Sequence, residues 1–165
     1  MRLVAIVLAA GSSSRLGRPK QEIVYQGETL LERAVRIARE VADEVVVVTR
    51  DNNPDADEGI ASSIRVGVAA AGEARILITL CDQPLITAAH LRTLIAAEAP
   101  IVATVYGGIA GVPAVFGPEF MMELLALRGD RGARAVIARH KEITHGIPFE
   151  DAAVDIDTEG DLLRL

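Results

Sequence analysis

Aromatic residues, cysteine and excess positive charge are all scarce in this sequence. Phe, Trp and Tyr make up only 3% of the 165 residues. The core therefore has to be built from Val, Ile, Leu and Ala, which favours helices packed over a parallel sheet. The single cysteine, Cys81, excludes an intramolecular disulfide framework and fits a reducing compartment, so we expect a cytoplasmic protein. With 17 basic and 23 acidic residues the formal charge is −6, which argues against non-specific binding of nucleic acid.

Long hydrophobic runs are also absent. The first apolar run, residues 3–10, is far shorter than the roughly 20 residues that a membrane-spanning helix needs. With Arg2 before it and Ala-Ala-Gly at its end, this run could be read as a secretory signal. It serves better as the first core strand, and we expect no membrane association.

Short β-branched runs alternate with stretches of helical character. Strands are expected at residues 3–10, 44–49, 75–80, 101–106, 112–116 and 143–147, with helices between most of them. This alternation predicts an α/β fold, a three-layer doubly wound sandwich around a mainly parallel sheet. No internal repeat or linker interrupts the pattern, so residues 1–165 are expected to form a single domain. Ligands bind at the carboxyl ends of strands in such sheets, where the segments LAAG and CDQPL lie.

Three local patterns predict how particular helices begin and end. Thr29 and Glu32 have the spacing of a capping box that opens a helix. Ser62 and Ser63 have the composition of a helix N-cap pair. Residues 118–127 are expected to form one helix, and a short closing helix is expected from Thr158.

A glycine- and serine-rich loop with three cations follows the first strand. Small residues and glycines let backbone N–H groups point at anionic oxygens, while arginine and lysine neutralise their charge, so the loop predicts a polyphosphate site. Five residues separate its two glycines and Arg-Pro follows, so it is not a Walker loop, and the dinucleotide fingerprint GxGxxG is absent. The loop residues are Gly11, Ser12, Ser13, Ser14, Arg15, Gly17, Arg18 and Lys20.

Carboxylates suited to a hard cation occur at two places. Asp82 follows the strand at residues 75–80 and could hold Mg²⁺ against phosphate oxygens. In the segment VDIDT, alternation puts Asp155 and Asp157 on one face, and Asp157 could equally cap the last helix. Cys81 is interpreted as strand packing rather than a nucleophile, because no histidine is near it in the sequence.

The segments LAAGSSSRLGRPK and CDQPL resemble the motifs LAAGxSxRxGxxK and DQP of MobA-like NTP transferases, which are related to the molybdenum cofactor guanylyl- and cytidylyltransferases. The resemblance implies a nucleotide-diphospho-sugar transferase-like fold. It also implies that the loop wraps a nucleoside triphosphate, that Arg15 holds the outer phosphates, and that Lys20 neutralises the α-phosphoryl group. Asp82 would bind the catalytic Mg²⁺, completed by Asp155 or Asp157. The nucleotide-binding residues implied are Leu8, Ala9, Ala10, Gly11, Ser12, Ser13, Ser14, Arg15, Lys20, Gly59, Ser62, Ser63 and Asp82.

The function implied is transfer of a nucleoside monophosphate from an NTP, expected to be CTP, to a phosphorylated small molecule, expected to be molybdopterin. Ala10 is associated with the cytidylyl branch, because the guanylyl branch more often has glycine there and a methyl group narrows the space for a purine. A molybdoenzyme or its chaperone could be a partner. The alternatives are a guanylyltransferase, a transferase acting on another phosphorylated small molecule, an oxidoreductase, or a non-catalytic module that binds a nucleotide or cofactor.

Overall fold

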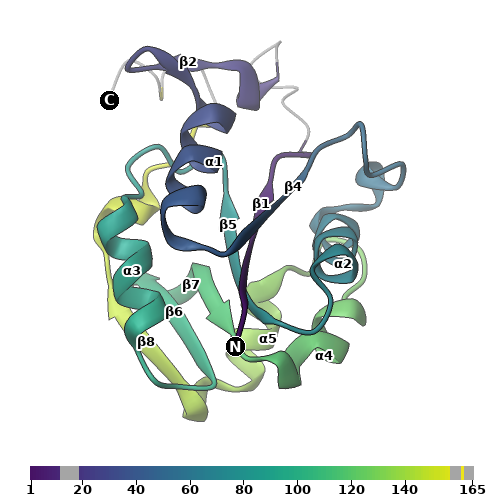
Figure 1. Cartoon of the computed structure of the whole chain (residues 1–165), viewed down its shortest axis with the longest axis vertical. Coiled ribbons are helices and arrows are strands. Elements are labelled where there is room, and N and C mark those ends of the chain that lie inside the picture. The colour runs from purple at the N-terminus through teal and green to yellow at the C-terminus, as the bar shows by residue number, and fades with distance from the viewer. Residues whose placement is uncertain (12–18, 157–160, 162–165) are drawn as a thin grey trace.

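The computed structural model describes residues 1–11, 19–156 and 161, and its centre is a six-stranded sheet (Figure 1). The strand order is β4-β1-β5-β7-β6-β8. All pairs are parallel except those of β7, which is antiparallel to both β5 and β6. These strands are β1 (Leu3–Leu8), β4 (Glu44–Val48), β5 (Arg75–Leu80), β6 (Ile101–Tyr106), β7 (Ile109–Phe116) and β8 (Thr144–Pro148). The expected mainly parallel sheet is confirmed.

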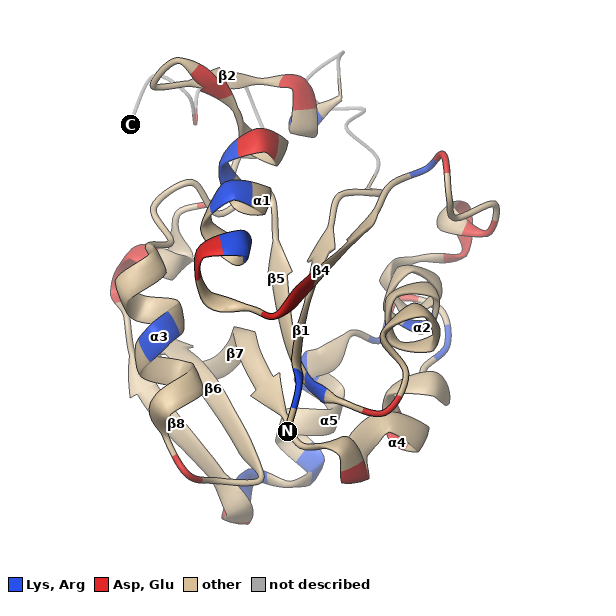
Figure 2. Cartoon of the chain, viewed as in Figure 1, with Lys and Arg blue, Asp and Glu red and all other residues tan. Residues whose placement is uncertain are grey.

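Helices cover both faces of the sheet, giving the expected three layers (Figure 1). One face carries α1 (Leu30–Val41) and α3 (Ala88–Ala96), and the other carries α2 (Ile60–Ala71), α4 (Met121–Leu125) and α5 (Ala133–Arg139). Charged residues gather on the helices, the loops and the strand ends, and the middle of the sheet is uncharged (Figure 2). Among the described residues, no helix is both long and apolar enough to cross a membrane.

Strand β1 shows why the apolar run at the start of the chain forms the middle of the sheet. All six of its residues are buried between β4 and β5. Successive side chains of a strand point to opposite faces. Val4, Ile6 and Leu8 accordingly join the core under α2, whereas Leu3, Ala5 and Val7 join the core under α1 and α3. A strand that is buried on both faces reads as a continuous apolar run.

The predicted capping box forms at the start of α1. The Glu32 backbone N–H donates to Thr29 Oγ1 at 3.0 Å, and the Thr29 N–H donates to Glu32 Oε1 at 3.3 Å. Just before it, a two-stranded hairpin joins β2 (Val24–Tyr25) to β3 (Glu28–Thr29). Ile23, Leu30 and Ile156 form a small third core beside the hairpin.

Short 3₁₀ helices make several of the connections. They are η1 (Lys20–Glu22), η2 (Ala56–Glu58), η3 (Pro118–Phe120), η4 (Lys141–Ile143) and η5 (Glu150–Ala153). Both η1 and η2 contribute residues to the cleft described below.

Two local predictions were wrong and one lies outside the described residues. Helix α2 begins at Ile60 with Gly59 as its N-cap, so Ser62 and Ser63 lie inside the helix instead of capping it. The helix expected at residues 118–127 is divided into η3 and α4. The closing helix expected from Thr158 falls outside the described residues.

Candidate active site

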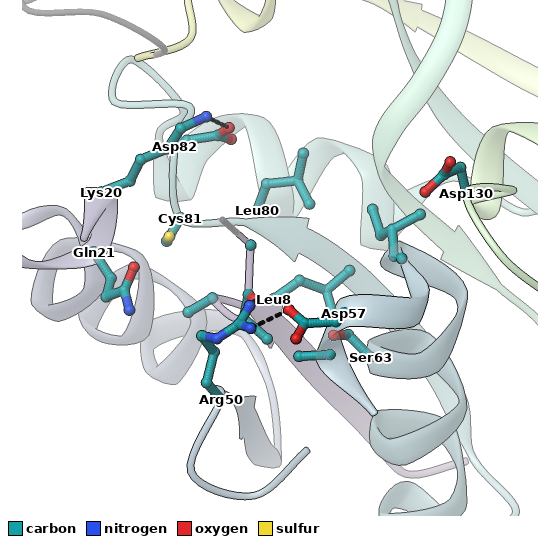
Figure 3. A pocket seen from close by; sticks show the side chains of 16 residues that line it. Leu8, Lys20, Gln21, Arg50, Asp57, Ser63, Leu80, Cys81, Asp82 and Asp130 are labelled. Carbon is teal, nitrogen blue, oxygen red and sulfur yellow. Dashed lines mark hydrogen bonds and ion pairs between the residues drawn. The ribbon is translucent and has the colours of Figure 1, made fainter. Parts of the chain in front are cut away.

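A cleft of about 410 Å³ opens at the carboxyl ends of β1 and β5, where the sequence predicts a ligand site (Figure 3). Its walls come from the ends of β1, β4 and β5, from η1 and η2, and from the start of α2. The described residues that line it are Leu8, Ala9, Ala10, Gly11, Lys20, Gln21, Arg50, Ala56, Asp57, Gly59, Ile60, Ser63, Leu80, Cys81, Asp82 and Asp130.

The end of β1 is held by backbone hydrogen bonds on both sides. The Ala9 N–H donates to the Val48 carbonyl at 2.8 Å, and the Cys81 N–H donates to the Leu8 carbonyl at 3.3 Å. Ala9 and Ala10 are buried, whereas Gly11 is exposed. The first residues of the glycine loop therefore leave a fixed sheet edge and enter the cleft.

Lys20 and Asp82 lie side by side at one edge of the cleft, with their charged groups pointing toward each other (Figure 3). Lys20 Nζ lies 3.6 Å from Asp82 Oδ2, and the side chains are 18% and 22% exposed. Partial burial lowers the local dielectric and strengthens the interaction of these charges with each other and with a ligand. A cation and a carboxylate so placed can serve a phosphate group and a metal ion, respectively.

The segment that contains Asp155 lies next to the Asp82 loop. The Ile156 backbone N–H donates to the Asp82 carbonyl at 3.1 Å, and Ile156 is fully buried. Asp155, immediately before Ile156, is exposed and belongs to no strand. Two of the three predicted metal ligands are therefore brought to the same edge of the sheet, and the third, Asp157, lies outside the described residues. Within the described part of the chain, no three His, Cys, Asp or Glu residues are grouped closely enough to hold a metal ion by themselves.

Gly59 and Ser63 line the cleft, whereas Ser62 does not. Both serines are buried, and the Asn53 amide donates to Ser62 Oγ at 3.0 Å and to Ser63 Oγ at 2.9 Å. Ser62 Oγ in turn donates to the Gly59 carbonyl at 2.9 Å. Buried polar groups need such partners, and here they hold the start of α2 beside the cleft.

Cys81 lines the cleft but is a poor nucleophile. Burial, reinforced by the neighbouring Asp82 carboxylate, raises the pKa of the Cys81 thiol to about 12. The nucleophilic form of cysteine is the thiolate. The thiol therefore stays protonated at neutral pH, which agrees with the interpretation of Cys81 as a packing residue.

Segments 58–61 and 127–130 are joined into one wall, which we call the partition. Glu58 accepts hydrogen bonds from the Gly129 N–H at 2.9 Å and from both terminal nitrogens of Arg65, and the Ala61 N–H donates to the Gly129 carbonyl at 3.1 Å. The Arg65 hydrogen bonds and the Gly129 N–H hold the pKa of Glu58 down at about 2. The Glu58 carboxylate is therefore ionised at any physiological pH.

A second cleft of about 480 Å³ lies beside the first, and both clefts contain Leu8, Ile60, Leu80 and Asp130. Its walls are mostly apolar, with Asp130, Arg131, Arg134 and Tyr106 as polar groups. The Arg134 guanidinium donates to the Tyr106 hydroxyl at 3.4 Å. A side chain at Gly111 would meet that hydroxyl at 3.2 Å, so the absence of one makes room for the pair.

Six other residues of the predicted polyphosphate loop lie outside the described part of the chain. They are Ser12, Ser13, Ser14, Arg15, Gly17 and Arg18. Apart from Ser62, the remaining nucleotide-binding candidates all line one cleft: residues 8–11, Lys20, Gly59, Ser63 and Asp82.

Sequence reasoning missed Arg50 and Asp57. Arg50 Nη1 donates to the Ala10 carbonyl at 3.1 Å, and Arg50 also pairs with Asp57 (Figure 3). Arg50 follows the strand EVVVV and so belongs to the same sheet edge as LAAG, which is a signal that could have found it.

Comparison with known proteins places these features in one family. Residues 5–143 match the model of the MobA-like NTP transferase domain. A probable molybdenum cofactor guanylyltransferase of Opitutus terrae is 36% identical over 103 residues, which cover 53% of this chain and 51% of that relative. The match thus spans about half the length of that relative. The molybdenum cofactor cytidylyltransferase of Escherichia coli is 23% identical over 177 residues, covering 96% of this chain and 92% of that protein.

Solved structures show the same architecture. Rv0371c from Mycobacterium tuberculosis is 27% identical with a TM-score of 0.86, covering 99% of this chain and 96% of that one. A structure of Rv0371c in complex with manganese is 26% identical with a TM-score of 0.78, covering 100% of this chain and 98% of that one.

Proposed function

Because the chain belongs to the MobA-like NTP transferase family and is a nucleotidyltransferase, we propose that residues 1–165 form one domain that transfers a nucleoside monophosphate from CTP to molybdopterin. The other product is pyrophosphate. The observation that carries this proposal is the Lys20–Asp82 pair, 3.6 Å apart, in the cleft that begins at the glycine loop. It puts a cation and a metal-binding carboxylate where a triphosphate would enter.

Direct transfer between the two phosphates fits the groups in the cleft. A phosphate monoester has a second pKa of about 6 and is already a dianion at neutral pH, so it needs no protein base. One of its oxygens attacks the α-phosphorus, and the bond from that phosphorus to the bridging β-phosphate oxygen breaks. A covalent intermediate on Cys81 is not required, and its raised pKa disfavours one. The chain then acts by positioning the reactants and neutralising their charge.

Lys20 has two partners in this scheme. Its Nζ lies 3.6 Å from Asp82 Oδ2. An incoming nucleoside triphosphate would draw the ammonium toward its α-phosphoryl group, because the triphosphate as a whole carries more negative charge than one carboxylate. Arg15 would hold the outer phosphates.

The residues near Asp82 fit a hard divalent cation. Asp82 offers carboxylate oxygens at the cleft. The backbone hydrogen bond between Asp82 and Ile156 holds the segment that contains Asp155 next to the Asp82 loop. Carboxylate and phosphate oxygens are the ligands that Mg²⁺ prefers. We propose Mg²⁺ as the physiological ion, held by Asp82 with Asp155 or Asp157. When bound, it would neutralise charge on the phosphate oxygens.

The second cleft suits the acceptor. Its apolar walls match a planar heterocycle, and Arg131 and Arg134 supply the positive charge that a phosphate needs. The two clefts meet at Leu8, Ile60, Leu80 and Asp130, so ligands in both could approach each other. This arrangement supports a phosphorylated ring compound such as molybdopterin.

Pyrophosphate release tests the proposal directly. The protein is incubated with CTP, GTP, UTP or ATP, with and without molybdopterin, in Mg²⁺ or Mn²⁺. We expect release that requires both molybdopterin and the metal and that is fastest with CTP. Preference for GTP would make the protein a guanylyltransferase, and release with a different phosphorylated acceptor would replace molybdopterin.

The variant Asp82→Ala tests whether Asp82 is needed for metal-dependent turnover, and Asp51→Ala is its control. Asp51 follows β4 as Asp82 follows β5, but it does not line the cleft. We expect Asp82→Ala to lose metal-dependent turnover with an unchanged circular dichroism spectrum, and Asp51→Ala to keep it. Full activity of Asp82→Ala would overturn the metal assignment. Nucleotide binding without any pyrophosphate release would favour a non-catalytic module, and a spectral change with NAD(P)H would favour an oxidoreductase.

A further inference from the structure

Gln83 is buried directly behind Asp82 and contacts two segments that are distant in the sequence. It is only 5% exposed and follows the last residue of β5 by three positions. Its side-chain Nε2 donates to the Val112 carbonyl at 3.2 Å and to the Ala152 carbonyl at 3.1 Å. One carboxamide thus uses both of its N–H donors on separate backbone segments.

Each of the two segments leads to one part of the proposed site. Val112 belongs to β7 and lines the second cleft. Ala152 is the buried residue of η5 and lies three residues before Asp155, and the same segment returns to the Asp82 loop through the Ile156 N–H. Gln83 and the Ile156 bond therefore fix the segment 152–156 to the Asp82 loop at two points.

The side-chain oxygen of Gln83 indicates that the two hydrogen bonds of Nε2 explain why an amide occupies this buried position. Gln83 Oε1 is buried and accepts no hydrogen bond from the described residues. A buried acceptor without a partner is unfavourable. A methionine would fill a similar volume without that oxygen, so packing alone favours an apolar residue here. What only the amide supplies is the pair of donors.

We propose that Gln83 is a positioning residue, which holds the Asp155 segment and the Val112 wall of the acceptor cleft in register with Asp82. The proposal rests on the proposed function, since it takes Asp82 and Asp155 as the cation side of the site and the second cleft as the acceptor side. Gln83 itself reaches neither cleft, so it would act only through these backbone segments.

The test compares Gln83→Met with Arg75→Met. Arg75 is a matched control, because it also donates to two backbone carbonyls, those of Ile95 and Ala97, but at the opposite end of β5. Three quantities are measured on each variant and on the wild type. They are hydrogen exchange of the Ile156 amide, Mn²⁺ affinity of the nucleotide-free protein by electron paramagnetic resonance, and the KM values for nucleotide and acceptor.

We expect Gln83→Met to exchange the Ile156 amide about 10-fold faster, because one of the two tethers of its segment is gone. Loss of a residue that orients metal ligands typically weakens metal binding by about 10-fold or more, which is the change expected for Mn²⁺. The acceptor KM should rise while the nucleotide KM changes little. Arg75→Met should change none of these quantities, whatever its effect on melting temperature.

Unchanged exchange at Ile156 would overturn the positioning role, and so would equal changes in both KM values. If Gln83→Met does not fold, Gln83→Asn is used, since it keeps the amide but is one methylene too short to reach both carbonyls. Failure of the proposed function gives a different result. In that case the wild type releases no pyrophosphate and binds no Mn²⁺, while the hydrogen-exchange comparison still decides whether Gln83 tethers the segment.

Discussion

Substitution of Gly59 by alanine tests whether the partition between the two clefts depends on close backbone contact. Gly59 has φ +130° and ψ −176°, a region that is essentially restricted to glycine. A Cβ at this position would lie 2.4 Å from the Gly129 carbonyl oxygen and 2.5 Å from Asp130 Oδ1. Because the closest contact is backbone, segment 127–130 would have to move.

The expected loss of stability combines three contributions. Backbone strain in this region costs about 1 to 3 kcal/mol, and overpacking adds about 1 to 3 kcal/mol. The lower conformational entropy of the unfolded alanine chain offsets about 0.4 to 1 kcal/mol. The net decrease in the free energy of unfolding is about 3 kcal/mol, which leaves a domain of ordinary stability folded.

Substitutions at Gly129 and Gly132 distinguish the effect of backbone strain from the effect of steric collision. Gly129 also has a positive φ, +67°, but a Cβ there would have no neighbouring atom within 4 Å, so Gly129→Ala should cost about 1 kcal/mol. At Gly132 φ is −100° and a Cβ would meet Ile60 Cγ2 at an ordinary 3.4 Å. Gly132→Ala should therefore stay within about 1 kcal/mol of the wild type, the range of an N-cap change.

Urea unfolding of the three variants gives the free energies by linear extrapolation, and pyrophosphate release gives the kinetics. We expect Gly59→Ala to lose the most stability and to raise the KM of both substrates, because the partition borders both clefts. Equal stability and equal KM values for Gly59→Ala and Gly132→Ala would refute the argument from close contact.

Three further predictions address single groups of the site. Lys20→Ala should lower kcat about 100-fold, as for loss of one charge-stabilising donor, with little change in nucleotide affinity measured by calorimetry. A pure loss of affinity would contradict the α-phosphate role of Lys20. Ala10→Gly should shift the CTP/GTP ratio of kcat/KM toward GTP, and an unchanged ratio would remove the steric argument. Glu58→Gln should lower stability at neutral pH but not near pH 2. Hydrogen bonds from Arg65 and Gly129 hold the pKa of Glu58 at about 2 against an ordinary 4.5, so its contribution is complete above pH 4.5 and is lost as the pH falls toward 2. Urea midpoints measured at several pH values, compared between wild type and variant, check the last prediction.

The sequence predicts the local parts of the molecule well, because their signals are carried by neighbouring residues. The buried run of β1 and the capping box of Thr29 and Glu32 both appear where they were expected. Helix α2 begins earlier than expected, because Asn53 takes the hydroxyls of Ser62 and Ser63 and Gly59 becomes the N-cap.

From the sequence alone one can predict the succession of strands and helices along the chain, and that the segments of Lys20 and Asp82 lie at one edge of the sheet. Hydrophobic periodicity and motif spacing are local properties, and parallel strands bring their carboxyl ends to one edge. Which residues from distant parts of the chain meet at that edge is set by tertiary packing. Arg50 reaches the Ala10 carbonyl across 40 residues of chain, and Glu58 reaches Gly129 across 71. Gln83 likewise joins two segments that no sequence spacing relates to it. Such contacts form only after the sheet has assembled, because the packing of distant segments sets their distances.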